Sequence, residues 1–361
     1  MDHRLGRCGE VLALCLLACP VTGCARIKVS MLTHRKIENC VEVRAGRTRL
    51  VVVPPWAGRI SVLDFGAGNV LWSDPKIDGR VLKPAEGWAP WDGNATDIVR
   101  SDGKRQWKGL WLHPWPNVKL LDNGVEIESE VSAEAKLSAR RVYRLSPNGK
   151  MVAYNYVISN RDGPPTGWTI WERALVPAGG YAIAPVARGG AFPNGWIVRD
   201  NATVDPPGCA VAHGGFLVMR AGTKTGVGLA ARLRAGWIGS VRGSHALLVT
   251  FELAKEGKTE LPHGVVRFPE PGEVRYAHCN GAHAAFWLAP EQVEIEPLSP
   301  EITLSGGLSG SFTQVWHWLD LPKHLDRDDP AAIGEWLEKQ ATARARWLEV
   351  FDDRLFTIEF R

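Results

Sequence analysis

Residues 141–158 read RVYRLSPNGKMVAYNYVI and contain the clearest hairpin pattern in this chain of 361 residues. Two apolar runs, residues 141–145 and 151–158, flank the sequence Ser146-Pro147-Asn148-Gly149. Pro, Asn and Gly favour tight turns because they suit the backbone dihedral angles that such turns require. We therefore predict two antiparallel strands joined by a short turn.

Short apolar runs separated by Gly, Pro, Asn and Asp continue on both sides of this hairpin, from about residue 40 to residue 321. Residues 124–131 alternate apolar side chains with glutamates, as a half-buried strand does. Further strands are predicted at residues 41–44, 48–53, 59–65, 70–72, 168–176, 216–219, 226–231, 246–253, 292–296 and 311–318. Many short strands without interleaved helices indicate an all-β, antiparallel sandwich.

The sequence changes character near residue 326. Asp328 or Asp329 can cap a helix with Pro330 in its first turn, and apolar side chains then recur at helical spacing to about residue 350. Residues 355–360 could form a last strand. We expect residues 326–361 to pack as a helix and a terminal strand on a sandwich of residues 40–325.

The first 23 residues have the organisation of a signal peptide. His3 and Arg7 precede an apolar run, residues 11–18, that is too short to cross a bilayer as a helix. The sequence Val-Thr-Gly-Cys that ends at Cys24 resembles the bacterial lipobox, which implies lipidation of Cys24 and attachment to the cell envelope through lipid alone. Residues 24–39 would then be a linker. A secretory signal with a fortuitous cysteine is the alternative.

The composition excludes several function classes. The chain has 43 Lys and Arg against 39 Asp and Glu, a formal net charge of +4, with both signs interspersed, so nucleic acid is not an expected partner. Motifs for phosphate loops, dinucleotide-binding turns, zinc peptidases and serine hydrolases are missing. His278, Cys279 and His283 are closely spaced, but we interpret them as part of a loop. We therefore expect neither a metal nor a cofactor.

Tryptophan is unusually frequent, with 16 residues in the chain. Five of them lie between residues 87 and 116, near Lys108 and His113: Trp88, Trp91, Trp107, Trp111 and Trp115. Aromatic rings beside polar groups suit a sugar, whose C–H face stacks while its hydroxyl groups form hydrogen bonds. The segment therefore favours carbohydrate binding. A Trp-rich loop pinned over one end of the sandwich is the alternative.

Four short motifs resemble one known family. The sequence PPWAGRIS at residues 54–61, followed by GNVLW at 68–72, is similar to the opening of galactose mutarotase-like domains of the aldose 1-epimerase superfamily. WKGLWLHP at 107–114 and VEIEPLSP at 293–300 resemble its cleft-lining segment and its closing acidic strand. The likeness covers about residues 40–320 and is greatest to an uncharacterised branch of bacterial envelope lipoproteins. It implies a mutarotase-like supersandwich with a sugar site.

Mutarotation requires a carboxylate base and an acid that protonates the ring oxygen. The resemblance assigns the base to Glu296, with Glu294 as the alternative. Enzymatic members carry a histidine on the strand that matches residues 168–176, but that strand reads Trp-Thr-Ile-Trp-Glu-Arg here. Either His113 supplies the acid, or the domain only binds.

We predict a sugar cleft at residues 107–115, with Trp111 and Trp115 as stacking surfaces facing Glu296. The other candidate contacts are Arg59, Lys108, Glu294 and Arg173. Arg173 and the preceding Glu172 could equally form ion pairs between strands. The favoured function is an envelope-anchored carbohydrate-binding protein; the alternatives are an aldose 1-epimerase-like enzyme, with Glu296 as base and His113 as acid, and a structural interaction module.

Overall fold

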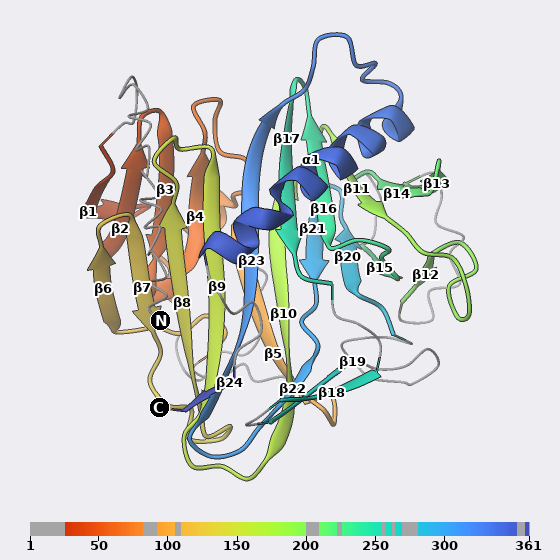
Figure 1. Cartoon of the computed structure of the whole chain (residues 1–361). Coiled ribbons are helices and arrows are strands. Elements are labelled where there is room, and N and C mark those ends of the chain that lie inside the picture. The colour runs from red at the N-terminus through yellow and green to blue at the C-terminus, as the bar shows by residue number, and fades with distance from the viewer. Residues whose placement is uncertain are drawn as a thin grey trace, which may run out of the picture.

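The computed structural model describes residues 26–81, 92–104, 110–199, 209–221, 226–253, 257–261, 264–268, 281–351 and 358–360. These residues form three antiparallel sheets and a long C-terminal helix (Figure 1). The expected signal peptide, Cys24 and Lys108 lie outside the described residues. No helix in the described ranges has both the length and the apolarity needed to cross a membrane.

The smallest sheet has four strands in sequence order: β1 (Lys28–His34), β2 (Ile37–Ala45), β3 (Thr48–Val53) and β4 (Arg59–Asp64). β1 lies within residues 24–39, so the expectation of a linker throughout that range is wrong. This strand is at the edge of its sheet and its side chains are exposed or half-buried, so its sequence lacks the apolar run that marks a buried strand.

The second sheet has nine strands within the described residues and is built around one long strand, β10. β10 pairs with β5 over residues 168–174, with β21 near its end over residues 174–177, and with β22 near its start. Its strands are β5 (Asn94–Arg100), β10 (Thr166–Pro177), β12 (Trp196–Val198), β15 (Val227–Ala231), β18 (Gly257–Leu261), β19 (Gly264–Phe268), β20 (Ala284–Leu288), β21 (Gln292–Pro297) and β22 (Glu301–Leu304).

The third sheet has eleven strands in the described ranges, and its longest, β23, lies between β17 and β9. The hairpin predicted at residues 141–158 is confirmed as β8 and β9, with Leu145 opposite Val152. The strands are β6 (Asn117–Leu121), β7 (Gly124–Glu128), β8 (Leu137–Leu145), β9 (Met151–Asn160), β11 (Tyr181–Pro185), β13 (Ala210–His213), β14 (Phe216–Met219), β16 (Trp237–Arg242), β17 (His245–Phe251), β23 (Leu308–Asp320) and β24 (Ile358–Phe360).

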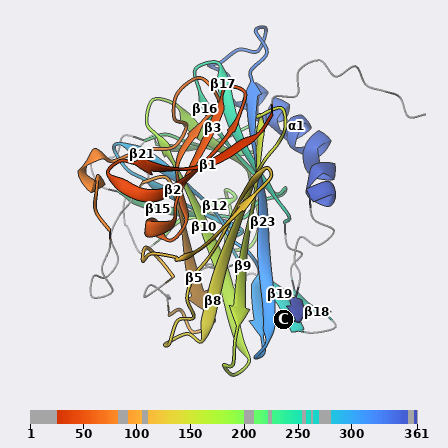
Figure 2. The same cartoon turned by 90° about the vertical axis from the view of Figure 1, so that its left-hand side faces the viewer.

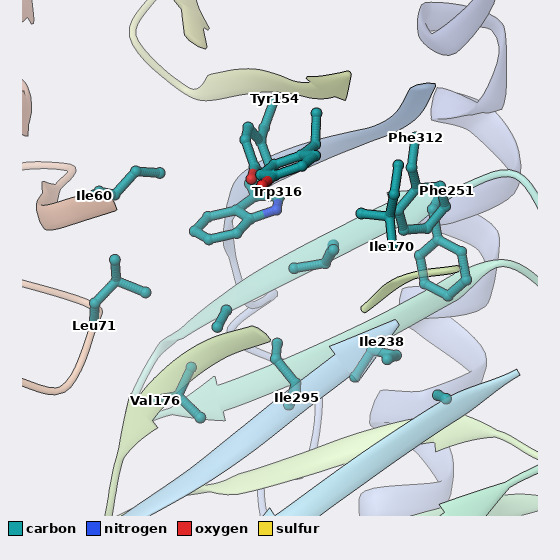
Figure 3. Packing of buried hydrophobic residues seen from close by; sticks show 14 of the residues in the cluster. Ile60, Leu71, Tyr154, Ile170, Val176, Ile238, Phe251, Ile295, Phe312 and Trp316 are labelled. Carbon is teal, nitrogen blue, oxygen red and sulfur yellow. The ribbon is translucent and has the colours of Figure 1, made fainter. Parts of the chain in front are cut away.

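The main hydrophobic core joins all three sheets. Side chains of the nine-stranded sheet, such as Ile170 and Ile295, belong to one cluster with Phe251, Phe312 and Trp316 of the eleven-stranded sheet (Figure 3). Alternate residues of β9, namely Val152, Tyr154, Tyr156 and Ile158, enter this core, as the pleat of a β-strand requires. The all-β sandwich expected from the sequence is therefore confirmed.

The helix α1 (Pro330–Phe351) crosses the outer face of the eleven-stranded sheet, on the side away from β10 (Figure 2). Ile333 and Leu337 of the helix are buried against side chains of that face in a second apolar cluster. The side chain of Asp329 caps the helix, because its Oδ1 accepts hydrogen bonds from the backbone N–H groups of Ala331 and Ala332. The predicted brace is confirmed.

No strand forms at residues 70–72, where the sequence predicted the second half of a hairpin. Instead, Asp64 Oδ1 accepts hydrogen bonds from the N–H groups of Gly66, Ala67 and Gly68, and only a single bridge joins Asp64 to Asn69. The turn was predicted correctly. The Asp64 carboxylate accepts the hydrogen bonds of the turn N–H groups, however, and no second strand follows the turn.

Candidate functional site

The strand β10 directs successive side chains to opposite faces of the nine-stranded sheet. Ile170 and Ala174 enter the main core between the sheets. Trp171 and Arg173 lie on the other face, where Trp171 pairs in register with Asp97 of β5. We call this second surface, with Trp171, Arg173 and Asp97, the Arg173 face.

The guanidinium of Arg173 connects three acidic side chains from two neighbouring strands. Its Nη2 lies 2.6 Å from Asp97 Oδ2 on β5. Its Nε lies 3.4 Å from Glu294 Oε2 and 3.6 Å from Glu296 Oε1, both on β21. Trp171 Nε1 donates a 2.7 Å hydrogen bond to Glu296 Oε2. These contacts agree with the interpretation of Arg173 as a partner in ion pairs between strands.

Glu294 and Glu296 form a pair of carboxyl groups on one strand, two residues apart and on the same face. The side chain of Glu296 is 4% exposed, whereas that of Glu294 is 18% exposed. Burial, followed by the proximity of Glu296, raises the pKa of Glu294. Glu294 therefore favours its protonated form, whereas the carboxyl group of Glu296 is held by Trp171 and Arg173.

Arg59 and Trp111 extend this cluster towards the four-stranded sheet. The Arg59 Cζ lies 4.5 Å from the centroid of the Trp111 ring, and the Arg173 Cζ lies 5.4 Å from the same ring. Arg59 is buried, and this burial, with the nearby charges of Arg141 and Arg173, lowers its pKa to about 9. One indole thus lies against two cationic side chains.

The predicted stacking surfaces are buried. Trp111 is 2% exposed and packs with the apolar residues beneath the four-stranded sheet, while Trp115 is 1% exposed and belongs to the main core. The prediction that both rings rim an open cleft is therefore wrong. The neighbouring Leu110 and Leu112 are also buried, so residues 110–112 pack in the apolar interior.

His113 is also buried. In the described part of the chain, the polar neighbours of Glu296 are Trp171, Arg173 and Glu294, and His113 is not one of them. The proposed acid role of His113 thus has no support from the contacts of Glu296. Lys108, the remaining predicted contact, lies outside the described residues.

A second ionic cluster lies inside the sandwich. Glu172 Oε1 accepts hydrogen bonds from Thr96 Oγ1 (2.8 Å) and Tyr154 Oη (2.9 Å). Arg141 is buried with its guanidinium 5.2 Å from the rings of Trp115 and Tyr156. Burial raises the pKa of Glu172 to about 7, although the charge of Arg141 opposes the shift. Because the main core encloses it, this cluster is a structural feature rather than part of the site.

Trp287 is the residue that sequence reasoning missed. It lies on β20 directly opposite Glu294 of β21, so both side chains belong to the Arg173 face. The ring is 38% exposed and packs over Gly226, where an added Cβ would lie 2.0 Å from the Trp287 Cζ2 atom. Its strand reads Ala-Ala-Phe-Trp-Leu, an apolar run that does not distinguish an exposed ring from a buried one.

No metal centre is present among the residues that the structure describes, since no group of three or more His, Cys, Asp or Glu side chains is arranged to hold an ion. The site is therefore a surface of arginines, carboxyl groups and indoles. Such a surface offers hydrogen bonds and an apolar ring face to a polar ligand.

The comparison with known proteins rests on structure. No family model matches the sequence, and no curated protein matches it either. The chain is similar in structure to a candidate aldose 1-epimerase from Klebsiella pneumoniae, with a TM-score of 0.54, 11% identity and 87% of each chain covered.

Two further solved structures are similar. The Slr1438 protein from Synechocystis has a TM-score of 0.50 and 11% identity, with 83% of this chain and 99% of that chain covered. A galactose mutarotase related enzyme from Lactobacillus acidophilus has a TM-score of 0.49 and 10% identity, with 79% and 98% covered. The similarity to the Klebsiella and Synechocystis structures shows that the architecture of this chain is the galactose mutarotase-like fold.

Proposed function

We propose that this protein binds a carbohydrate on the Arg173 face, at Trp287 and Glu294. The observation that carries this proposal is the exposed ring of Trp287 directly across from the partly exposed carboxyl group of Glu294. A sugar presents an apolar C–H face and a ring of hydroxyl groups, and this pair offers a partner to each. The mutarotase-like fold supports a carbohydrate-related role.

The arrangement of the face strengthens this argument. Trp287 is fixed by its packing over Gly226, so a ligand meets a ring that is already ordered. Arg173 lies 3.4 Å from Glu294 and holds that carboxyl group in place. Stacking on one indole contributes on the order of 1 kcal/mol beyond the burial of area, by analogy with aromatic pairs, which is about a tenfold change in affinity.

A glycan array with the full chain tests the proposal. We expect defined glycans to bind, and we expect Trp287→Ala to weaken their affinity by about tenfold in titration calorimetry with little change in melting temperature. Leu120→Ala is the matched control, because Leu120 is 45% exposed on β6 of the other large sheet. A silent array, or equal binding by the Trp287 variant, would contradict the proposal.

An aldose 1-epimerase activity is the second candidate, and the paired carboxyl groups of Glu294 and Glu296 favour it. In this mechanism Glu296 removes the proton of the anomeric hydroxyl group, and an acid protonates the ring oxygen as the ring opens. Glu294 and His113 are the two candidates for that acid.

Exchange between the α and β anomers, followed by saturation-transfer NMR, tests this activity. We expect Glu296→Gln to abolish it. The variants Glu294→Gln and His113→Asn then identify the acid by which of them slows exchange. A protein that binds sugars but never accelerates exchange is a binding protein only. A protein that does neither is best explained as a structural interaction module.

We also propose that the chain is attached to the cell envelope through a lipid on Cys24. The support is the sequence pattern of residues 1–24, with its charged start, short apolar run and lipobox-like end. Several acyl chains are needed for stable attachment, because a single chain anchors a protein only marginally. Membrane fractionation and mass spectrometry of wild type and Cys24→Ala test this; an unchanged, still membrane-bound variant would contradict it.

A further inference from the structure

Two hollows adjoin at the end of the sandwich where β23 finishes, which is uppermost in Figure 1. Their volumes are about 510 and 580 Å³, which is the size range of small-molecule sites. Ala67, His245 and Trp318 line both hollows. We call the two hollows together the end groove. The exposed residues Arg47 and Arg242 form part of its walls, so a ligand reaches the groove directly from solvent.

Three aromatic rings are stacked where the two hollows adjoin. The centroid of the Trp318 ring lies 5.1 Å from that of Phe65 and 4.9 Å from that of His245, with angles of 9° and 14° between the ring planes. Polar contacts hold the His245 ring as well, since Ser244 Oγ lies 3.2 Å from its Nδ1 and Asp320 Oδ1 lies 3.4 Å from its Nε2. All three aromatic residues are half-buried, so the groove presents an ordered aromatic surface before any ligand binds.

The backbone of two turns faces the open space of the groove. Gly68 and Gly243 have φ values of +97° and +58°, and both line the hollow that Arg242 also lines. An added Cβ would have no heavy atom within 4 Å at either position. These glycines therefore leave room for a ligand to approach the main chain closely.

Polar side chains surround the aromatic stack. Lys150 Nζ lies 3.0 Å from Asp320 Oδ2, and both side chains are more than half exposed. An exposed ion pair adds little to stability, so both groups can bind a ligand at small cost. Amide, hydroxyl and guanidinium groups also line the walls, at Asn69, Asn148, Ser240 and Arg242. Flat rings beside such donors and acceptors suit a sugar, whose C–H face stacks while its hydroxyl groups form hydrogen bonds.

The end groove lies close to the proposed site at Trp287 and Glu294. Pro177, the last residue of β10, lines the groove and pairs in register with Gln292 of β21. Glu294 lies two residues further along β21, which is about 7 Å at the rise of a strand. Gln292 Nε2 also donates a 3.2 Å hydrogen bond to Glu294 Oε1. A chain of linked sugars is therefore long enough to contact both places.

We infer that the end groove is a second sugar-binding site, so that the ligand of this protein is a glycan chain of several units rather than a monosaccharide. This inference rests on the proposed function and adds a substrate class to it. Once one unit is bound at Trp287, the units that follow reach the groove as part of the same molecule, which raises the affinity of the whole chain.

The test is a series of glycan chain lengths, titrated against the full protein in a calorimeter. Malto-, cello- and chito-oligosaccharides of two, four and six units are compared with D-glucose and N-acetyl-D-glucosamine. We expect at least one series to bind about tenfold more tightly at six units than at two. An affinity that does not rise with chain length in any series that binds would overturn the inference.

Trp318→Ala removes the ring that contacts both other rings of the stack and should reduce the rise with chain length to less than about twofold. His245→Ala is the milder variant, because this side chain is 31% exposed, and it decides the matter if Trp318→Ala does not fold. His213→Ala is the matched control, since His213 is exposed on β13 and lines neither hollow. A rise that persists in both groove variants would show that the later units bind elsewhere, and would overturn the inference.

Trp287→Ala separates this inference from the proposed function. Sugar binding that is lost in Trp287→Ala, and that is equal for short and long chains in wild type, overturns the inference and leaves the proposed function intact. Binding of long chains that survives Trp287→Ala but is lost in Trp318→Ala supports the end groove and contradicts the proposed binding on the Arg173 face. Silent titrations with every series overturn both.

Discussion

Glu172 and Arg173 are consecutive residues of β10, but their charged groups belong to two separate ionic clusters on opposite faces of one sheet. Glu172 is bound by Thr96 and Tyr154 inside the sandwich, whereas Arg173 is bound by Asp97 on the outer side. Thr96 and Asp97 are themselves consecutive on β5 and pair in register with β10. In each pair, Thr96–Asp97 and Glu172–Arg173, the first residue therefore points into the interior and the second lies on the Arg173 face.

The first prediction concerns the pH dependence of stability. Glu172 has a pKa of about 7 in the folded protein, against about 4.5 when unfolded, so folding favours its neutral form. This contribution is fully present below about pH 4.5 and is lost as the pH rises to about 7. The pKa difference corresponds to about 3 kcal/mol.

Glu172→Gln should remove this dependence. We expect the free energy of unfolding of wild type, relative to the variant, to fall by about 3 kcal/mol between pH 4.5 and pH 8. Urea denaturation at several pH values measures it. Both proteins contain every other titratable group, so the difference between their free energies of unfolding reports Glu172. Parallel plots of free energy against pH would show that Glu172 is ionised in the folded protein over this whole range.

The second prediction concerns the buried indoles. Because Trp111 and Trp115 are buried in apolar clusters, Trp111→Ala and Trp115→Ala should each lower the free energy of unfolding by about 3–5 kcal/mol. Chemical denaturation measures the loss. Trp287→Ala is the matched exposed control and should cost much less. A small loss at Trp115 would show that this side chain is not part of the core.

The third prediction concerns the backbone before β5. Gly93 has a φ of +77°, and an added Cβ would lie 1.9 Å from the carbonyl oxygen of Ile60. Gly68 has a φ of +97° with open space around its Cα, so Gly68→Ala measures the backbone strain alone, about 1 kcal/mol. Gly93→Ala adds a steric clash and should cost more than about 3 kcal/mol in a denaturant titration. Equal losses would contradict the close approach of β4.

The fourth prediction concerns the start of α1. Asp329→Ala removes the acceptor for two N–H groups of the first turn and should lower the free energy of unfolding by about 1 kcal/mol. Asp328→Ala is the control, because the adjacent Asp328 side chain makes no capping hydrogen bond within the described residues. Thermal melts of both variants decide between the two candidate caps that the sequence left open.

Most of the fold could be predicted from the sequence where apolar runs are bounded by turn residues. The strands at residues 48–53 and 216–219 were predicted with the bounds that the structure has. The first ends before Pro54, and the second begins after Gly214 and Gly215. β1 was missed because its side chains are largely solvated, so no apolar pattern marks it. The sequence of a strand also does not indicate which distant strand it pairs with.

The candidate site was harder to predict, because tryptophan occurs both in the core and at the surface. The Trp-rich segment predicted a sugar site, but two of its rings, Trp111 and Trp115, are buried. Among the described residues the exposed tryptophan is Trp287, far away in the sequence. Glu294, Glu296 and Arg173 were found through a family resemblance and by their strand positions. Arg59 was named as a contact, but it is buried, which is a property of three-dimensional packing.

The central position of β23 has a consequence for synthesis of the chain. β23 pairs with β9 on one side and with β17 on the other, and its Ser309 lies 2.7 Å, Oγ to Oγ, from Ser159, which is 150 residues earlier. Pairings over such distances form slowly because a long loop must close first. Until β23 itself leaves the ribosome, the edges of β9 and β17 that it covers are unpaired, so a nascent chain should depend on chaperones to keep those edges from aggregating.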